Sequence, residues 1–88
     1  MNRLIVRPLK FDDFGAWLPL WDGNNLGQRD EAVTTETWTR LNDPENWMVN
    51  GLRAELGGEI VGIVHYILHP TTGNIAPVCY MQDVFVSP

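Results

Sequence analysis

The stretch VCYMQDVFVSP, residues 78–88, decides how the rest of this sequence is interpreted. It predicts a strand with apolar residues on both faces, at the two-residue period of extended backbone. The two predicted faces are Val78, Tyr80, Val84 and Val86 on one side, and Cys79, Met81 and Phe85 on the other. Such a strand is typical of the middle of a covered sheet, so we expect further chain to supply its next strand and helix.

The first part of the sequence predicts a strand followed by a helix. Leu4–Val6 form a short β-type run that ends before Pro8. Asp12 and Asp13 are expected to cap the helix, and Pro19 inside it should bend the helix or make it begin again. The expected buried face carries Phe14, Trp17, Leu18 and Trp21.

A loop and a second helix are expected next. The segment 24–32 is polar and has no hydrophobic period, which favours a loop. Thr34 is expected to cap the second helix, with Trp38 and Leu41 facing inward. Residues 42–44, Asn-Asp-Pro, end it.

The second half predicts three consecutive strands. Residues 52–56 alternate between apolar and charged side chains, and Gly57-Gly58 is typical of a two-residue hairpin turn. Residues 60–68 form the returning strand, residues 70–73 the next turn, and residues 78–86 the last strand. The order β-α-α-β-β-β indicates a single α+β domain with an antiparallel meander.

Composition limits the functional classes. The chain has 88 residues, enough for one domain, and a formal net charge of −5 argues against a nucleic-acid partner. Cys79 is the only cysteine and lies in an apolar run, so we expect a buried, inert thiol and no disulfide. We expect a cytoplasmic protein without a membrane partner, because no signal peptide or long apolar segment is visible.

Three stretches in this order resemble the GNAT acetyltransferase superfamily: IVRPLKFDD at 5–13, LRAELGGEIVGIVHYILH at 52–69 and YMQDVFVSP at 80–88. The similarity is strongest to diamine and other small-amine acetyltransferases. It implies that residues 1–88 are the N-terminal half of a GNAT-like acyltransferase fold, an incomplete domain lacking the C-terminal half that binds the pyrophosphate. It also implies acetyl-CoA as co-substrate and a small-molecule primary amine as acceptor.

The resemblance implies roles for the last strand. Residues Asp83–Val86 would run along the pantetheine arm, so Val84, Phe85 and Val86 are the candidate cofactor-binding residues, with an N–H near Val84 polarising the thioester. The sequence alone equally allows a plain core strand, and a β-bulge that frees such a donor is permitted. The leaving-group acid in this superfamily is commonly a tyrosine beyond residue 88, and Tyr66 and Tyr80 are interpreted as core aromatics.

Gln82 and Asp83 are the candidate catalytic residues, because they are the only polar side chains inside this strand. Adjacent strand residues point to opposite faces, so one of them should face a cleft. Related diamine acetyltransferases carry a glutamate at the place of Gln82, but an amide cannot accept a proton. Gln82 could orient an amine or a water; Asp83 could act as a base or accept backbone hydrogen bonds. We favour a water relay at Gln82 and a structural Asp83.

The remaining candidates give weaker signals. His65 and His69 lie about 13 Å apart along one strand, too far for one metal ion, so no metal site is expected. His65 is interpreted as a hydrogen-bonded structural histidine, with a relay to the acceptor cleft as the alternative. The loop 24–33 offers Gln28, Asp30 and Glu31, which do not identify the amine.

Two functions therefore remain open. The first is an N-acetyltransferase of which this chain supplies the acceptor side and the pantetheine strand, completed by a second half. The second is a non-catalytic module that dimerises, or pairs with another chain, through the edge of residues 78–86.

Overall fold

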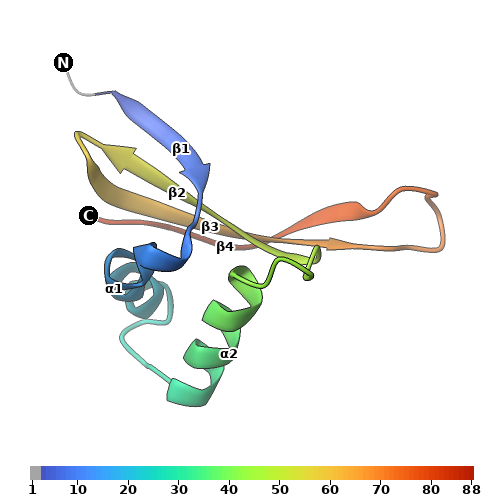
Figure 1. Ribbon diagram of the computed structural model, residues 1–88, viewed down its shortest axis with the longest axis horizontal. Coiled ribbons are helices and arrows are strands. Elements are labelled where there is room, and N and C mark those ends of the chain that lie inside the picture. The colour runs from blue at the N-terminus through green and yellow to red at the C-terminus, as the bar shows by residue number, and fades with distance from the viewer. Residues whose placement is uncertain (1–2) are drawn as a thin grey trace.

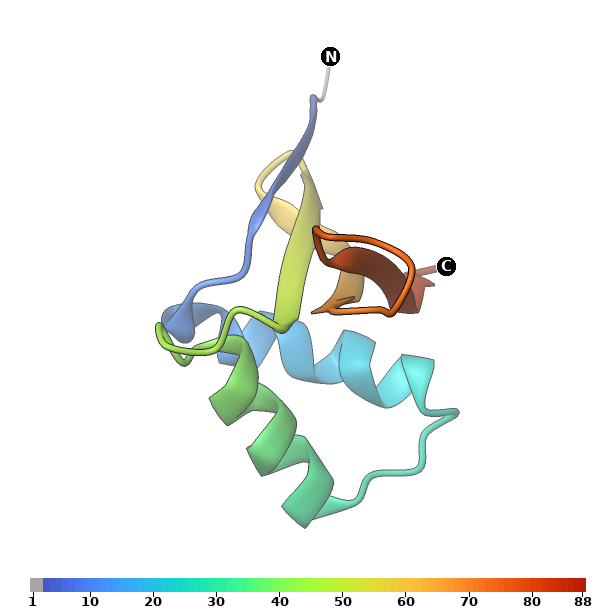
Figure 2. The ribbon, with the colours of Figure 1, turned by 90° about the vertical axis from the view of Figure 1, so that its right-hand side faces the viewer.

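A four-stranded antiparallel sheet with two helices on one face forms the structure, a computed structural model that describes residues 3–88 (Figures 1 and 2). The strands lie in the sheet in the order β1-β2-β3-β4. The elements are β1 (Leu4–Pro8), the 3₁₀ turn η1 (Phe11–Asp13), α1 (Phe14–Asn24), α2 (Glu31–Leu41), β2 (Val49–Leu56), β3 (Glu59–His69) and β4 (Val78–Val86). The predicted fold class and element order are confirmed.

The start of α1 differs from the prediction. Asp13 precedes the helix, but its carboxylate makes no capping bond to a helical N–H. It accepts instead from the backbone N–H of Lys10 at 2.7 Å and from the guanidinium groups of Arg7 and Arg53. Asp12 and Asp13 therefore belong to the η1 turn, and the helix continues without interruption through Pro19.

The start of α2 was predicted too late in the sequence. Asp30 is the N-cap, and its side chain accepts from the backbone N–H of Val33 at 3.1 Å. Thr34, the predicted cap, lies inside the helix, where its buried hydroxyl accepts from the indole N–H of Trp21 at 2.8 Å. Its side chain satisfies a buried donor rather than a helix end.

Three tryptophans form the centre of the core, as predicted. Trp17 is fully buried, and its ring lies 5.2 Å from that of Trp21 and 4.7 Å from that of Trp38, measured between centroids. Leu20 and Ile63 complete the buried cluster. The core therefore joins both helices to the middle of β3.

Tight turns and long strands shape the sheet. Gly57 and Gly58 link β2 to β3 with φ angles of 60° and 84°, the left-handed region that glycine adopts without strain. The β3–β4 hairpin extends well past the helices (Figure 1). Tyr80, predicted as a core aromatic, lies on this extension and is 56% exposed.

A β-bulge in β4 changes the predicted faces of that strand. Asp83 pairs with His65 and Met81 pairs with Tyr66, so Gln82 is an extra residue without a partner. Register therefore puts Val78 and Tyr80 on the helix-covered face together with Asp83 and Phe85, since paired residues share a face. The prediction that Val78 and Tyr80 share a face with Val84 and Val86 was therefore wrong, because one extra residue reverses the two-residue alternation of the strand.

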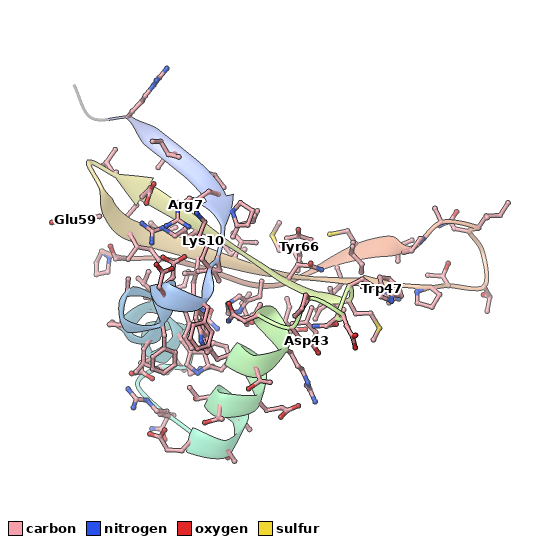
Figure 3. All side chains as sticks on the ribbon, viewed as in Figure 1. Arg7, Lys10, Asp43, Trp47, Glu59 and Tyr66 are labelled. Carbon is pink, nitrogen blue, oxygen red and sulfur yellow. The ribbon has the colours of Figure 1, made fainter. Side chains whose placement is uncertain are left out.

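The face of the sheet away from the helices carries apolar side chains that the described residues leave uncovered. Tyr66 marks this face on β3 (Figure 3). The exposed members on the outer strands are Leu4, Val6, Met81, Val84 and Val86. Cys79 belongs to the same face and is exposed, so the prediction of a buried thiol was wrong.

Candidate functional site

A cavity of about 300 Å³ lies between the two helices and the sheet. Its volume is at the lower end of the range for small-molecule sites. The lining residues come from five elements and one adjoining loop: Trp21, Asn25, Thr37, Arg40, Val49, His65, Ile67, Gln82 and Asp83. Polar groups thus converge on a wall that is otherwise aromatic and aliphatic.

Asp83 supplies the carboxylate of this cavity. The α1 residue Asn24 donates its side-chain amide to Asp83 Oδ1 at 3.0 Å, and Asp83 Oδ2 lies 3.0 Å from His65 Nδ1. The side chain remains 20% exposed. Its partners are therefore side chains, and the carboxylate keeps access to the cavity.

His65 lies behind Asp83, almost completely buried. Its ring accepts at Nε2 from the indole N–H of Trp17 at 3.0 Å. Burial lowers the pKa of His65 below its usual value, although the hydrogen bond and the charge of Asp83 act in the opposite direction. A neutral, hydrogen-bonded histidine joins the core to the site, which agrees with the structural interpretation of His65; a relay through it stays a prediction.

Gln82 lines the same cavity as Asp83. The sequence predicted opposite faces for these neighbours, but the bulge at Gln82 interrupts the alternation on which that prediction depended. The cavity therefore has an amide and a carboxylate at adjacent positions of β4.

The backbone N–H and C=O groups of the candidate cofactor-binding residues point in alternating directions along β4. Ser87 donates its N–H to the carbonyl of Val61 at 2.8 Å, so these two opposite residues form a hydrogen-bonded pair between β4 and β3. Hydrogen-bonded and non-hydrogen-bonded pairs alternate along an antiparallel ladder. Val84 and Val86 therefore direct their N–H and C=O groups away from β3, toward a strand edge that no other described strand covers. Phe85 directs its backbone toward β3, and its side chain packs against the core.

Several candidates from the sequence lie outside the cavity. Gln28, Asp30 and Glu31 do not line it, and Arg29 bridges Asp22 and Glu31 on the surface. His69 lies at the end of β3. Within residues 3–88, no group of three His, Cys, Asp or Glu side chains is arranged to hold a metal ion. No helix in that range is long and apolar enough to cross a membrane.

Sequence reasoning missed Asn24, Trp17 and Arg40 as parts of the site. Trp17 and Asn24 contact it only because α1 packs across β3 and β4. Thr37 and Arg40 line the cavity three residues apart on α2. That helical spacing of two polar residues was the one available signal, and it also describes an ordinary wet helix face.

Comparison with known proteins gives consistent results, although no family model matches the chain. The D-amino-acid N-acetyltransferase HPA3 of Saccharomyces cerevisiae is 30% identical over 91 residues, covering 98% of this chain and 56% of that protein. The chain therefore spans about half the length of this curated relative.

Solved structures give the same match at the level of the fold. An aminoglycoside N-acetyltransferase, AAC(6')-Iy, in complex with CoA superposes with a TM-score of 0.79 at 16% identity, over 100% of this chain and 58% of that one. AAC(6')-Ih from Acinetobacter baumannii gives 0.74 at 16% identity, over 98% and 58%. The curated relative supports the resemblance of this chain to the GNAT superfamily, and the superpositions show that the chain has the N-terminal half of an N-acetyltransferase fold.

Proposed function

We propose that this protein is an N-acetyltransferase that transfers the acetyl group of acetyl-CoA to a primary amine of a small molecule. The observation that carries the proposal is the cavity in which Asp83 and Gln82 meet, next to the open edge of β4. The acetyltransferases of similar sequence and fold support the same reaction. Because the chain spans about half their length, the activity belongs to the whole protein that carries these residues.

The open edge of β4 suits an extended amide-containing ligand. Val84 and Val86 offer backbone N–H and C=O groups at alternate positions, and the pantetheine arm of CoA contains two amide groups that can pair with such an edge. An N–H at Val84 is our candidate donor to the thioester carbonyl, where it would stabilise the oxyanion that forms during transfer. Phe85 contributes by anchoring the strand on the core.

The reaction follows from these positions. The amine nitrogen attacks the thioester carbonyl carbon, the C–N bond forms, and the C–S bond breaks with release of the CoA thiolate. Asp83 is our candidate to receive the amine proton, directly or through a water held by Gln82, because an amide alone cannot accept it. The thiolate then takes up a proton from an acid or from solvent.

The acceptor fits the polar wall of the cavity. A primary ammonium group is attracted by Asp83 and can donate to the amide oxygen of Gln82. The volume of about 300 Å³ favours a small molecule over a protein side chain held in an extended groove.

A direct assay tests the proposal. Purified protein, prepared as residues 1–88 and with any residues that its gene encodes beyond Pro88, is incubated with acetyl-CoA and a panel of diamines, amino acids and aminoglycosides. We expect release of free CoA thiol together with an acetylated amine identified by mass spectrometry. Absence of acetylation with every acceptor in both forms contradicts the proposal.

Two variants locate the chemistry. Asp83→Asn should lower the acetylation rate by roughly a hundredfold or more with little change in the affinity for acetyl-CoA. Asp12→Asn is the matched control, because Asp12 is exposed and outside the cavity. If instead Asp83 is only structural, its variant loses thermal stability and keeps its rate per folded molecule.

A second candidate function is a binding module that pairs through β4. The exposed apolar residues of that strand, including Met81, Val84 and Val86, favour it, since an uncovered apolar edge templates strand pairing. Light scattering at tens of micromolar protein decides this candidate. A dimer that persists when acetyl-CoA is added supports the module, whereas a monomer at all concentrations excludes it.

A further inference from the structure

A continuous line of hydrogen bonds runs from the centre of the core to the cavity. The indole N–H of Trp17 donates to His65 Nε2 at 3.0 Å, and His65 Nδ1 lies 3.0 Å from Asp83 Oδ2. On the far side of the carboxylate, Asn24 donates to Oδ1, also at 3.0 Å. The four side chains come from α1, β3 and β4, so helix and sheet jointly fix the position of Asp83.

The donors and acceptors of this line permit one form of the imidazole. An indole nitrogen can donate a hydrogen bond but cannot accept one, so His65 Nε2 carries no proton. The single ring proton of neutral His65 is then on Nδ1 and is donated to Asp83. A doubly protonated ring would place its Nε2–H against the N–H of Trp17, with no acceptor between them.

The burial of the two rings makes this constraint strong. Trp17 has no exposed surface and His65 is 2% exposed, so water cannot replace either partner. Among the described residues, the charged groups that share the cavity with His65 are Asp83 and, from α2, Arg40. An unpaired indole N–H in this core would carry the full desolvation cost of a buried donor.

The same geometry removes His65 as a direct proton acceptor for the amine. Both ring nitrogens already have partners inside the protein, and the ring is covered by Trp17 and Trp21 at centroid distances of 5.9 and 5.6 Å. His65 also lines the cavity but is only 2% exposed, so the carboxylate of Asp83, at 20% exposure, is the more accessible of the two groups.

We infer that Trp17 and His65 are positioning residues for Asp83: the indole locks the imidazole in its neutral Nδ1–H tautomer, and the imidazole holds the carboxylate toward the cavity. The inference deepens the proposed function and rests on it only for the consequence in catalysis. The lock itself is a property of the folded chain. A second fixed donor, Asn24, prevents rotation of the carboxylate away from His65.

Nitrogen NMR of the imidazole tests the lock in the unmodified chain. We expect His65 to show a protonated Nδ1 and an unprotonated Nε2 throughout the range near neutral pH. In Trp17→Phe the competing indole donor is absent, so Nε2 becomes free to take a proton while Nδ1 keeps its hydrogen bond to the Asp83 carboxylate. The midpoint of His65 protonation should then rise by at least one pH unit.

Trp38→Phe is the matched control. Trp38 belongs to the same buried cluster and packs against Trp17, but no hydrogen bond joins it to His65. It should leave the tautomer and the midpoint unchanged. A protonated Nε2 in the unmodified chain overturns the inference, and so does a midpoint that Trp17→Phe and Trp38→Phe shift equally.

Kinetics of the active protein test the consequence for Asp83. Trp17→Phe should lower kcat tenfold or more and change its pH profile, while the KM for acetyl-CoA stays constant. His65→Leu should lower kcat similarly, and His65→Asn, which retains a donor near the place of Nδ1, should recover part of it. Equal kcat values for His65→Leu and His65→Asn in folded protein contradict the positioning role. If no acceptor is acetylated but the NMR result holds, the proposed function fails and the tautomer lock stands.

Discussion

Asp13 and Arg53 form a buried ion pair that joins the turn before α1 to the middle of β2. Arg7 on β1 approaches the same carboxylate at 3.1 Å, and Glu55 pairs with both arginines. The label of Arg7 in Figure 3 marks this group of charges, which lies between the sheet and η1. Two cations and two anions thus balance one another where the first strand turns into the helical layer.

Removing the central carboxylate should destabilise the fold. Asp13→Asn leaves the buried guanidinium of Arg53 with one anionic partner fewer, and we expect a loss of about 3 kcal/mol in the free energy of unfolding. Urea denaturation measures it. Asp12→Asn, at an exposed neighbouring position, should change stability by less than about 0.5 kcal/mol. Equal effects of the two substitutions would contradict a structural role for this ion pair.

Acid should weaken the same ion pair. Burial acts to raise the pKa of Asp13, but the hydrogen bonds from Arg7 and Lys10 and the charge of Arg53 outweigh it and lower the pKa below its usual value. The stabilisation is therefore complete above the unfolded pKa of about 4 and is lost as the pH falls through the folded value. Urea midpoints measured between about pH 5 and pH 2 should fall less steeply for Asp13→Asn than for the unmodified protein.

His65 should make stability depend on pH in a higher range. Its pKa is lowered by burial, so the unfolded chain binds more protons between the folded and unfolded values. Its contribution is complete above the unfolded pKa of about 6.5 and is lost as the pH falls below it. His69→Gln keeps His65, so its thermal stability should fall between about pH 7.5 and pH 5.5. In His65→Gln the fall in thermal stability over the same range should be smaller.

Gly23 lets α1 approach β4 closely. A Cβ at this position would lie 2.5 Å from Cζ of Phe85, so Gly23→Ala must displace the aromatic ring and should cost about 1–3 kcal/mol. Gly15→Ala is the control in the same helix, because its Cβ would meet nothing within 4 Å. That substitution should stabilise the helix by up to about 1 kcal/mol. Denaturation curves for the pair would refute the contact if both variants gained stability.

Gln82→Glu should increase catalytic capacity. It puts a second carboxylate beside Asp83 in the cavity. We expect a higher acetylation rate, or a pH profile shifted to lower pH, if a water relay operates at Gln82. Kinetics unchanged in both Gln82→Glu and Asp83→Asn would move the proton acceptor away from β4.

The element order was predictable because period, turn residues and proline positions are local. The bounds of the strand at residues 78–86 and the position of the Gly57-Gly58 turn match the prediction. The cap of α2 was not predictable, because Asp30 and Thr34 are both good capping residues. Only in the folded chain does the hydroxyl of Thr34 accept from the indole N–H of Trp21, while Asp30 accepts from the backbone N–H of Val33. Nor was the His65–Asp83 pair, since the sequence does not specify which residue of β4 is the extra one.

The bulge at Gln82 has a practical consequence for any redesign of β4. Polar substitutions meant to improve solubility belong on the face away from the helices, at Cys79 and Met81 before the bulge and at Val84 and Val86 after it. These two pairs are out of phase by one residue. A designer who applied a single alternation along the whole strand would place half of the charges on the side of the sheet that carries the helices, and deletion of Gln82 would exchange the two sides of the hairpin tip.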